Sequence, residues 1–181
     1  MSVASFVLAC ALDLMGRSAA QLPPIILVER RPPEASPTAI AFVRRGERAI
    51  YLIASAPQFQ EAIKENRDAQ RCRQLEHLRF LASVIAHEEW HLLNGPDEKG
   101  AYYAQLTELQ RLGSGPDRWA FKAVRRAMAA TLERDAARQH AVEQMARATR
   151  SADAIPTAAS ASNRVWPRDA ADVSRLPLPP R

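Results

Sequence analysis

Five consecutive residues, His87-Glu88-Glu89-Trp90-His91, have the types and the spacing of a metal-dependent hydrolytic site. If this segment is helical, His87 and His91 lie one turn apart on the same face, where two imidazoles can bind one zinc ion. Glu88 then lies beside the coordination position that such a site leaves open to water. Zinc lowers the pKa of a bound water to about 7, and Glu88 can accept its proton. The pattern therefore predicts hydrolysis with Glu88 as the general base.

The residues after this pattern indicate a third zinc ligand. Asn94-Gly95-Pro96 ends the helix and turns the chain, and a second helix is expected to follow at once. Glu98 comes seven residues after His91, so the turn can bring its carboxylate back to the metal. Glu108 on the same second helix is the main alternative ligand, and Asp97 is a minor one.

Aromatic residues near the motif have either a catalytic or a structural interpretation. Tyr102 follows Glu98 by four residues on the same helix face, and its hydroxyl can donate a hydrogen bond to the oxyanion of a tetrahedral intermediate. Tyr103 is the alternative donor, and either tyrosine can instead be a core aromatic. Three further residues are interpreted structurally: Trp90 in the core, His77 partly buried on the motif helix, and His140 on a solvated helix.

The motif is predicted to lie on a long helix from about Glu61 to Leu93, because this range contains neither proline nor glycine. Its apolar residues recur at helical spacing, and the stripe continues into the two histidines and Glu88. Burying these polar groups is costly unless they are paired or bound to a metal, which strengthens the zinc interpretation. The apolar stripe comprises Leu78, Leu81, Val84 and Ile85.

The stretch from about His87 to Gln105 resembles the zincin metallopeptidases, and in particular a small bacterial-type minimal gluzincin. In gluzincins the third ligand is a Glu on a following helix, and the resemblance assigns this role to Glu98, although it comes unusually early. In the related metzincins a Gly precedes a third His; Gly95 is placed similarly, but no Met-turn is visible. The resemblance implies zinc as cofactor and a peptide or protein as substrate.

The elements before the motif predict the first half of such a domain. An N-terminal helix is expected to bury Leu8, Leu12 and Met15 and to end at Pro23-Pro24. In zincins an edge strand beside the metal binds the substrate backbone as an added strand, and the third strand is the best candidate by order. The expected strands are 25–28, 39–43 and 49–53, and a hairpin turn is expected at 44–47. The first of these strands is predicted to be buried.

Further helices complete the expected α+β, minimal zincin-like fold of residues 1–150. One runs from 96 to 112 and ends at Gly113, and another begins with Pro116 and runs to about Arg150. Residues 151–181 are rich in Ala, Ser, Pro and Arg, which predicts a disordered tail. The last helix is expected to bury Trp119, Val124, Met128 and Leu132.

The charge distribution suggests an alternative function. The chain has 25 basic and 20 acidic residues, and the excess lies on the last helix, where residues 113–150 have eight against four. A non-catalytic helical interaction or nucleic-acid-binding protein built on this helix is the alternative to an enzyme. We favour a solvated Arg-rich helix and expect no nucleic-acid partner. A third possibility is a zincin fold that binds metal without turnover.

Residues 1–20 allow two locations for the protein. They are largely apolar up to Leu14 and end near Ala20 in a sequence like a signal-peptidase site, but no basic residue precedes them and Asp13 interrupts them. We therefore expect a helix that packs on the core and a cytoplasmic protein, with export as the alternative. No apolar run is long enough to span a bilayer.

Several other chemistries find no support in the sequence. Cys10 and Cys72 are expected to form no disulfide framework, and no Cys–His pair suits nucleophilic catalysis. Neither a Gly-rich phosphate loop nor a G-x-S-x-G elbow is present. The length of 181 residues, 47% of them apolar, is enough for one domain core, but gives no information on oligomeric state.

Overall fold

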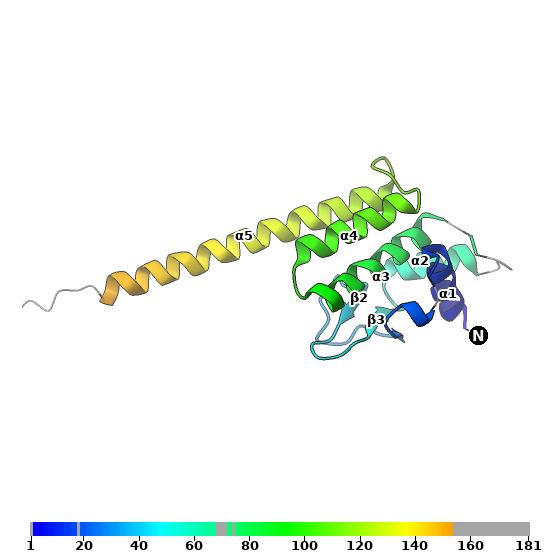
Figure 1. Ribbon diagram of the computed structural model, residues 1–181, viewed down its shortest axis with the longest axis horizontal. Helices are drawn as coiled ribbons and strands as arrows, with labels where there is room; N and C mark the ends of the chain where they lie inside the picture. The colour runs from blue at the N-terminus through cyan, green and yellow to red at the C-terminus, as the bar shows by residue number, and fades with distance from the viewer. Residues whose placement is uncertain (1, 18, 68–71, 74, 154–181) are drawn as a thin grey trace, which may run out of the picture. The chain divides into compact units, whose positions relative to one another are not determined.

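The computed structural model describes residues 2–17, 19–67, 72–73 and 75–153 (Figure 1). This part of the chain is α+β, with five α-helices, a short 3-10 helix and a three-stranded sheet, as expected from the sequence. It falls into two compact units, residues 1–141 and 142–181. The elements are α1 (Val3–Met15), the 3-10 helix η1 (Ala19–Gln21), β1 (Ile25–Val28), β2 (Ala41–Val43), β3 (Ile50–Ile53), α2 (Pro57–Asn66), α3 (Glu76–Asn94), α4 (Glu98–Arg111) and α5 (Trp119–Asp153).

Helix α1 packs on the core, as the sequence predicts. The hydroxyl of Ser2 accepts a hydrogen bond from the backbone N–H of Ser5, which caps the first turn. Gly16 ends the helix with φ of 66°, a conformation that glycine adopts without strain. The residues buried on the core face are Val7, Cys10, Ala11 and Met15, with Leu8 and Leu12 partly buried beside them.

A disulfide joins Cys10 in α1 to Cys72, which lies 62 residues later, between α2 and α3. The expectation that these cysteines form no disulfide was therefore wrong. Their Cα atoms lie 5.4 Å apart because α1 packs against both α2 and α3. The sequence has no local signal for this pairing, since only the tertiary packing brings the two thiols together.

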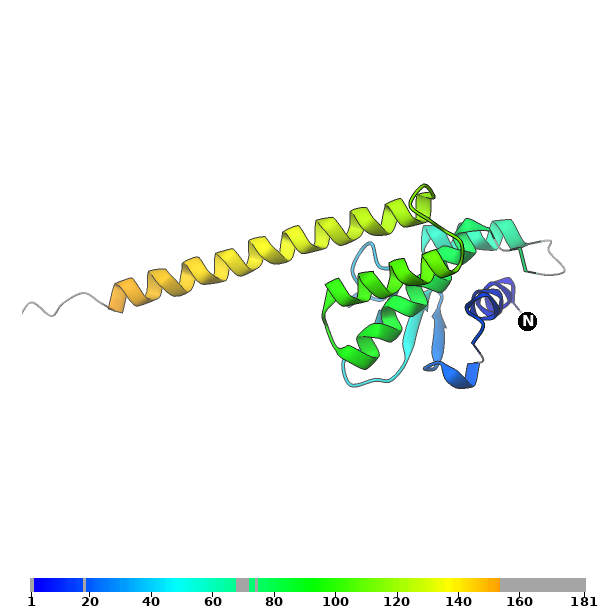
Figure 2. The same cartoon turned by 45° about the horizontal axis from the view of Figure 1, so that its top comes forward.

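The sheet has the strand order β1-β3-β2, so β3 is central and the two other strands are edges. β3 pairs parallel with β1 and antiparallel with β2 (Figure 2). The prediction that the third strand is the edge strand was wrong, because β3 pairs with a strand on each side, and all of its residues are accordingly buried. The hairpin turn between β2 and β3 is confirmed, with Gly46 at φ of 84°. β1 is less buried than expected, since Ile26 is 41% exposed.

The predicted single helix over 61–93 is two helices, α2 and α3. The buried side chain of Asn66 ends α2: its amide nitrogen donates to the carbonyl of Ala62, and its oxygen accepts from the backbone N–H of Arg73. Side chains that bond locally to the backbone in this way compete with helix continuation. A search for proline and glycine does not detect this kind of helix end.

Helix α3 lies between α4 and the sheet (Figure 1). The apolar stripe predicted for it is confirmed, since Leu78, Leu81, Val84 and Ile85 are all buried. α4 begins directly after the turn at residues 95–97 and packs along α3 more extensively than the other elements do. The motif on α3 and the first turn of α4 are thereby held close together.

Helix α5 begins at Trp119, three residues after the predicted start at Pro116. Its core-facing side chains also differ from the expected stripe: Val124 is buried, but Trp119 is 40% exposed. The actual buried face comprises Ala120, Phe121, Val124 and Thr131. The tail expected at 151–181 lies outside the described residues, apart from 151–153, which belong to α5. Among the described helices, none is both long and apolar enough to cross a membrane.

Candidate metal centre

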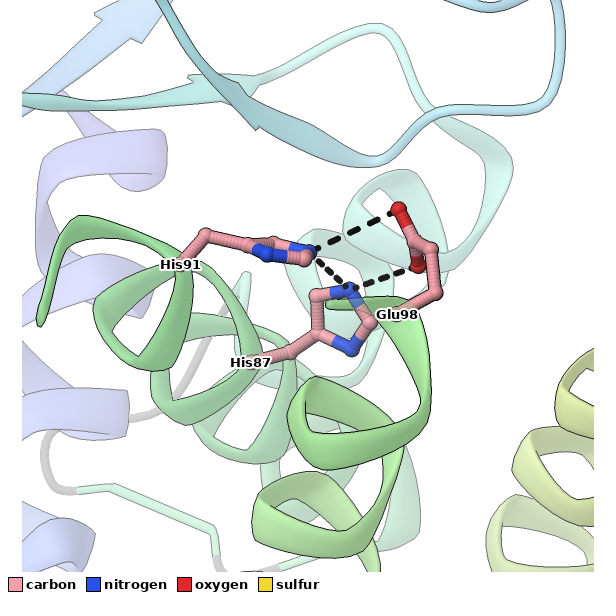
Figure 3. A group of neighbouring side chains, drawn as sticks. All are labelled: His87, His91 and Glu98. Carbon is pink, nitrogen blue, oxygen red and sulfur yellow. Dashed lines mark hydrogen bonds and ion pairs between the residues drawn. The ribbon is translucent and has the colours of Figure 1, made fainter. Parts of the chain in front are cut away.

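The side chains of His87, His91 and Glu98 converge at one point between α3 and α4 (Figure 3). Their candidate ligand atoms all lie within 4.8 Å of one another. The Nε2 atoms of the two histidines are 3.1 Å apart, and each lies 3.6 Å from a carboxylate oxygen of Glu98. Two helices therefore present two imidazole nitrogens and one carboxylate to a common position.

This donor set fits zinc in both chemistry and size. Two His and one Glu are a known ligand set of catalytic zinc, which leaves a fourth position open. Tetrahedral coordination with Zn–N distances of about 2.0–2.1 Å separates neighbouring donors by about 3.3 Å. The separations of 3.1 and 3.6 Å lie on either side of this value, so small side-chain adjustments are enough to hold the ion.

The two histidine rings are fixed by different contacts. His91 Nδ1 lies 2.9 Å from the carbonyl oxygen of Gly95, to which it can donate, so that its Nε2 is left as an acceptor for a metal. His87 Nδ1 is buried and has no hydrogen-bond partner among the described residues. The ring of His87 is instead held edge-on by the ring of Tyr102, with 4.8 Å between the centroids. Both rings therefore present Nε2 to Glu98.

Of the three carboxylates considered as third ligand, the structure brings Glu98 to the histidines and holds Asp97 and Glu108 elsewhere. The carboxylate of Asp97 caps α4 by accepting from the backbone N–H groups of Lys99 and Gly100, which keeps it away from the histidines. Glu108 is bound to Arg111, with 2.6 Å between Oε1 and Nη2. The same guanidinium donates to a backbone carbonyl of α1, which ties Glu108 to another part of the core.

Helix α4 approaches α3 closely because position 100 is a glycine. Any side chain at Gly100 would overlap the indole ring of Trp90 on α3. Trp90 packs against Gly100 of α4 and is only partly buried, so it is not a core residue as the sequence predicted, and the requirement for Gly100 was not foreseen. This close packing brings the first turn of α4 beside the histidines.

Glu88 is only 8% exposed and lies in the same cleft as the two histidines. Burial raises the pKa of its carboxyl from 4.5 to about 7 in the absence of a metal; the charge of His87 opposes this shift, and that of Glu98 adds to it. The neighbouring Glu89 is instead paired with Arg17, with 2.6 Å between Oε1 and Nη2. Of the two adjacent glutamates, Glu88 is therefore the one available for chemistry.

Tyr102 lies in the cleft, and Tyr103 is 53% exposed and does not line it. The hydroxyl of Tyr102 is 3.4 Å from the hydroxyl of Thr131 on α5. The structure therefore brings Tyr102, rather than Tyr103, to the cluster. Gln105, on the same face of α4, is buried and bonds through its amide to Ser83.

A cleft of about 1310 Å³ contains the cluster. One part of its lining is the segment 34–47, which includes the edge strand β2, and a second wall comes from residues 123–134 of α5. Sequence reasoning missed two polar residues of this second wall, Thr131 and Arg134. Their only signal is helical spacing from Val124 and Ala127, which places all four on one face of α5.

The carboxylate of Glu98 is in an environment that favours its charged form. Contact with His87 lowers its pKa most; burial opposes this effect, and the positive charges of His91 and Arg134 lower it further. The cluster therefore offers an ionised carboxylate to a cation.

The other two histidines lie outside the cluster, as expected. His77 is half-buried on α3, with Nδ1 2.7 Å from Glu65 and its ring 4.7 Å from that of Trp119. His140 is exposed on α5.

Comparison of the chain with protein-family models, with curated proteins and with solved structures found no match. Any function assigned to it therefore rests on its own residues.

Proposed function

We propose that the protein is a zinc metallopeptidase of the zincin type, which hydrolyses peptide bonds. The observation that carries the proposal is the convergence of His87, His91 and Glu98 within 4.8 Å, beside a buried Glu88 in a cleft. Bringing two partly buried histidines together with a buried and a partly buried carboxylate is costly unless a cation compensates the carboxylates. A cation with this donor set is best identified as zinc.

The chain's own residues have distinct roles in this proposal. His87, His91 and Glu98 hold the metal, which when bound supplies Lewis acidity to polarise the scissile carbonyl and to acidify water. Glu88 accepts the proton of the attacking water and transfers it to the leaving amine. The hydroxyl of Tyr102 donates a hydrogen bond to the oxyanion of the tetrahedral intermediate, and this bond replaces its contact with Thr131.

The edge strand β2 is proposed to bind the substrate backbone. Its inner side pairs with β3, and residues 39–43 line the cleft that contains the cluster. An extended peptide can add to such an edge through main-chain hydrogen bonds. This role, expected from the sequence for the third strand, therefore passes to β2.

The first experiment is metal analysis of the purified full-length chain at neutral pH. We expect one zinc per chain, lost in His87→Ala and in His91→Ala, because two imidazoles are among its three ligands. Since metal binding is coupled to folding, these variants should also have lower melting temperatures. A parent protein without zinc would contradict the proposal and favour the alternative of a helical interaction or nucleic-acid-binding protein.

A second experiment tests turnover with Glu88→Gln, which keeps the size of the side chain but cannot accept a proton. We expect this variant to keep its zinc and to hydrolyse a peptide library at least a hundred- to ten-thousandfold more slowly, roughly the range for loss of a general base. Equal rates for the variant and the parent would rule out the mechanism. A parent that holds zinc but cleaves no peptide would indicate the third possibility, metal binding without turnover.

A further inference from the structure

The wall of the cleft formed by α5 changes character along its length. Val124 and Ala127 form an apolar section, and Phe80 and Val84 of α3 add to the apolar lining of the cleft. Thr131 and Arg134 continue the same helix face as a polar section. From Val124 to Arg134 the helix rises by about 15 Å, which is enough to contact several residues of an extended peptide.

The polar section is connected to the metal cluster by a chain of contacts. The ring of Tyr102 packs on the ring of His87 at 4.8 Å, and its hydroxyl is 3.4 Å from that of Thr131. Arg134 donates through Nη2 to the same hydroxyl, at 2.9 Å, and through Nε to the carbonyl of Ala130, at 3.1 Å. The guanidinium of Arg134 is thus held at a defined place on the polar section of the cleft wall.

Arg134 has no carboxylate partner within ion-pair distance among the residues that the structure describes. Four other arginines of the same unit each pair with a glutamate: Arg17, Arg44, Arg79 and Arg111. Arg134 is thus a cation that lines the cleft and has no ion-paired carboxylate in the described part of the chain.

We propose that Arg134 is a substrate-binding residue that binds a carboxylate, so that the preferred substrates carry an acidic side chain or a free C-terminal carboxylate. This inference rests on the proposed peptidase function. A guanidinium and a carboxylate form two parallel hydrogen bonds, and such a pair is stronger and more specific than a bond between neutral groups. The two sources of the carboxylate share this chemistry and are separated by the experiment.

The experiment measures peptide binding by the zinc-loaded, full-length Glu88→Gln protein, which should hold peptides without cleaving them. The probes are three matched sets of octapeptides on an array: C-terminal amides with one Glu, the same amides with Gln in its place, and the Gln peptides with a free C-terminal carboxylate. We expect one carboxylate-bearing set to bind about ten- to a hundredfold more tightly than the neutral set, the usual range for a hydrogen-bonded charged group.

Variants at position 134 then test whether Arg134 is the residue responsible for this preference. Arg134→Gln should abolish it, and Arg134→Glu should reverse it, so that the neutral set binds more tightly than the carboxylate-bearing sets. The matched control is Arg126→Gln, because Arg126 is also exposed on α5 but does not line the cleft. With Glu88 restored, Arg134→Gln should raise KM for the best acidic peptide more than it lowers kcat, since it removes a binding contact away from the reacting bond.

Three results would overturn the role of Arg134: equal binding of carboxylate and neutral peptides, an unchanged preference in Arg134→Gln, or no binding of any peptide. The zinc content of each sample and cleavage of the array by the parent protein separate this failure from that of the proposed function. Zinc binding and cleavage without a carboxylate preference would overturn the inference alone. Absence of zinc or of cleavage would overturn the peptidase proposal.

Discussion

Glu88 and Glu89 are adjacent in the chain, and their carboxyl groups lie in opposite environments. Glu89 is paired with Arg17, which offers it two donors and a compensating charge. Glu88 is buried in the cleft without a basic partner of this kind among the described residues, and its pKa is raised to about 7. Helix geometry explains the difference, because consecutive residues are separated by about 100° around the axis.

The first prediction concerns the pH dependence of the metal-free protein. The pKa of Glu88 is higher in the folded state, about 7, than its ordinary value of 4.5. Its contribution to stability is therefore fully present below pH 4.5 and is lost as the pH rises through 7, by on the order of 3 kcal/mol. Glu88→Gln should remove this loss, so that the variant is more stable than the parent at pH 8. Thermal denaturation of EDTA-treated samples at pH 5 and pH 8 measures the effect, and parallel curves for both proteins would contradict it.

The second prediction compares the two candidate ligands on α4. Glu98 lies 3.6 Å from both histidines, whereas Glu108 is bound to Arg111. Glu98→Ala should therefore lower zinc affinity by more than the tenfold to hundredfold that is typical for loss of a group that only supports a ligand. Glu108→Ala, the matched control, should leave the affinity nearly unchanged. Competition with a chelator of known affinity measures both, and the reverse order would reassign the ligand.

The residues of the candidate site differ in how far the sequence could predict them. His87, Glu88 and His91 lie on one helix and Glu98 opens the next, so their spacing and the turn between the helices predicted this set, with Glu108 and Asp97 left as alternatives to Glu98. Arg134 lies on another helix, 36 residues after Glu98 in the chain, and no spacing rule relates it to the motif. Its place in the cleft depends on how α5 packs, which the sequence pattern does not determine.

At the scale of elements, the distance between α3 and α4 decides whether Glu98 reaches the histidines. The two helices approach closely because Gly100 leaves room for the ring of Trp90. Glycine is otherwise unfavourable inside a helix, by roughly 0.5–1 kcal/mol relative to alanine. Its presence in α4 is therefore explained by packing.

A third prediction follows from this packing. Gly100→Ala should destabilise the protein by about 1–3 kcal/mol, the usual cost of overpacking, although the same change in an uncrowded helix is stabilising. It should also weaken zinc binding, because α4 must shift away from the histidines. Gly115→Ala is the matched control, since a side chain there meets nothing within 4 Å and the backbone is not left-handed. Chemical denaturation of both variants tests the prediction, and a Gly100→Ala protein as stable as the parent would refute it.

The elements themselves were predicted unevenly for identifiable reasons. Periodic apolar residues identified α3, and the turn residues identified its end at Gly95. The end of α2 was missed because it depends on the side chain of Asn66, and the central place of β3 was missed because strand order is not encoded locally. Local sequence patterns therefore predicted which segments are helices and strands, but not which of these elements lie side by side.

At the scale of the whole molecule, the disulfide between Cys10 and Cys72 is the main feature that the sequence did not indicate. Disulfides persist in oxidising compartments and are rare in the cytoplasm. The cytoplasmic location expected from the sequence agrees poorly with this bond. Since α1 contributes four buried residues to the core, Cys10 among them, its removal as a signal peptide would also disrupt the fold.

The fourth prediction is that reduction of this bond weakens the fold. In the chain-entropy model, a cross-link that closes a loop of about 60 residues contributes about 4 kcal/mol. Cys10→Ser with Cys72→Ser, or treatment with a reductant, should lower the free energy of unfolding by this order. Thiol titration of the unfolded, unreduced chain should find no free cysteine. Two free thiols, or an unchanged denaturation midpoint after reduction, would show that the bond does not form in solution.

The same cross-link gives the polypeptide a distinctive electrophoretic behaviour. Residues 29–40, between β1 and β2, contain no helix or strand and lie between the two cysteines, so a protease cut there would divide the chain. The two fragments would nevertheless migrate as one band on a non-reducing gel and separate only after addition of a thiol. A backbone cut would thus leave α1 covalently attached to the rest of the protein.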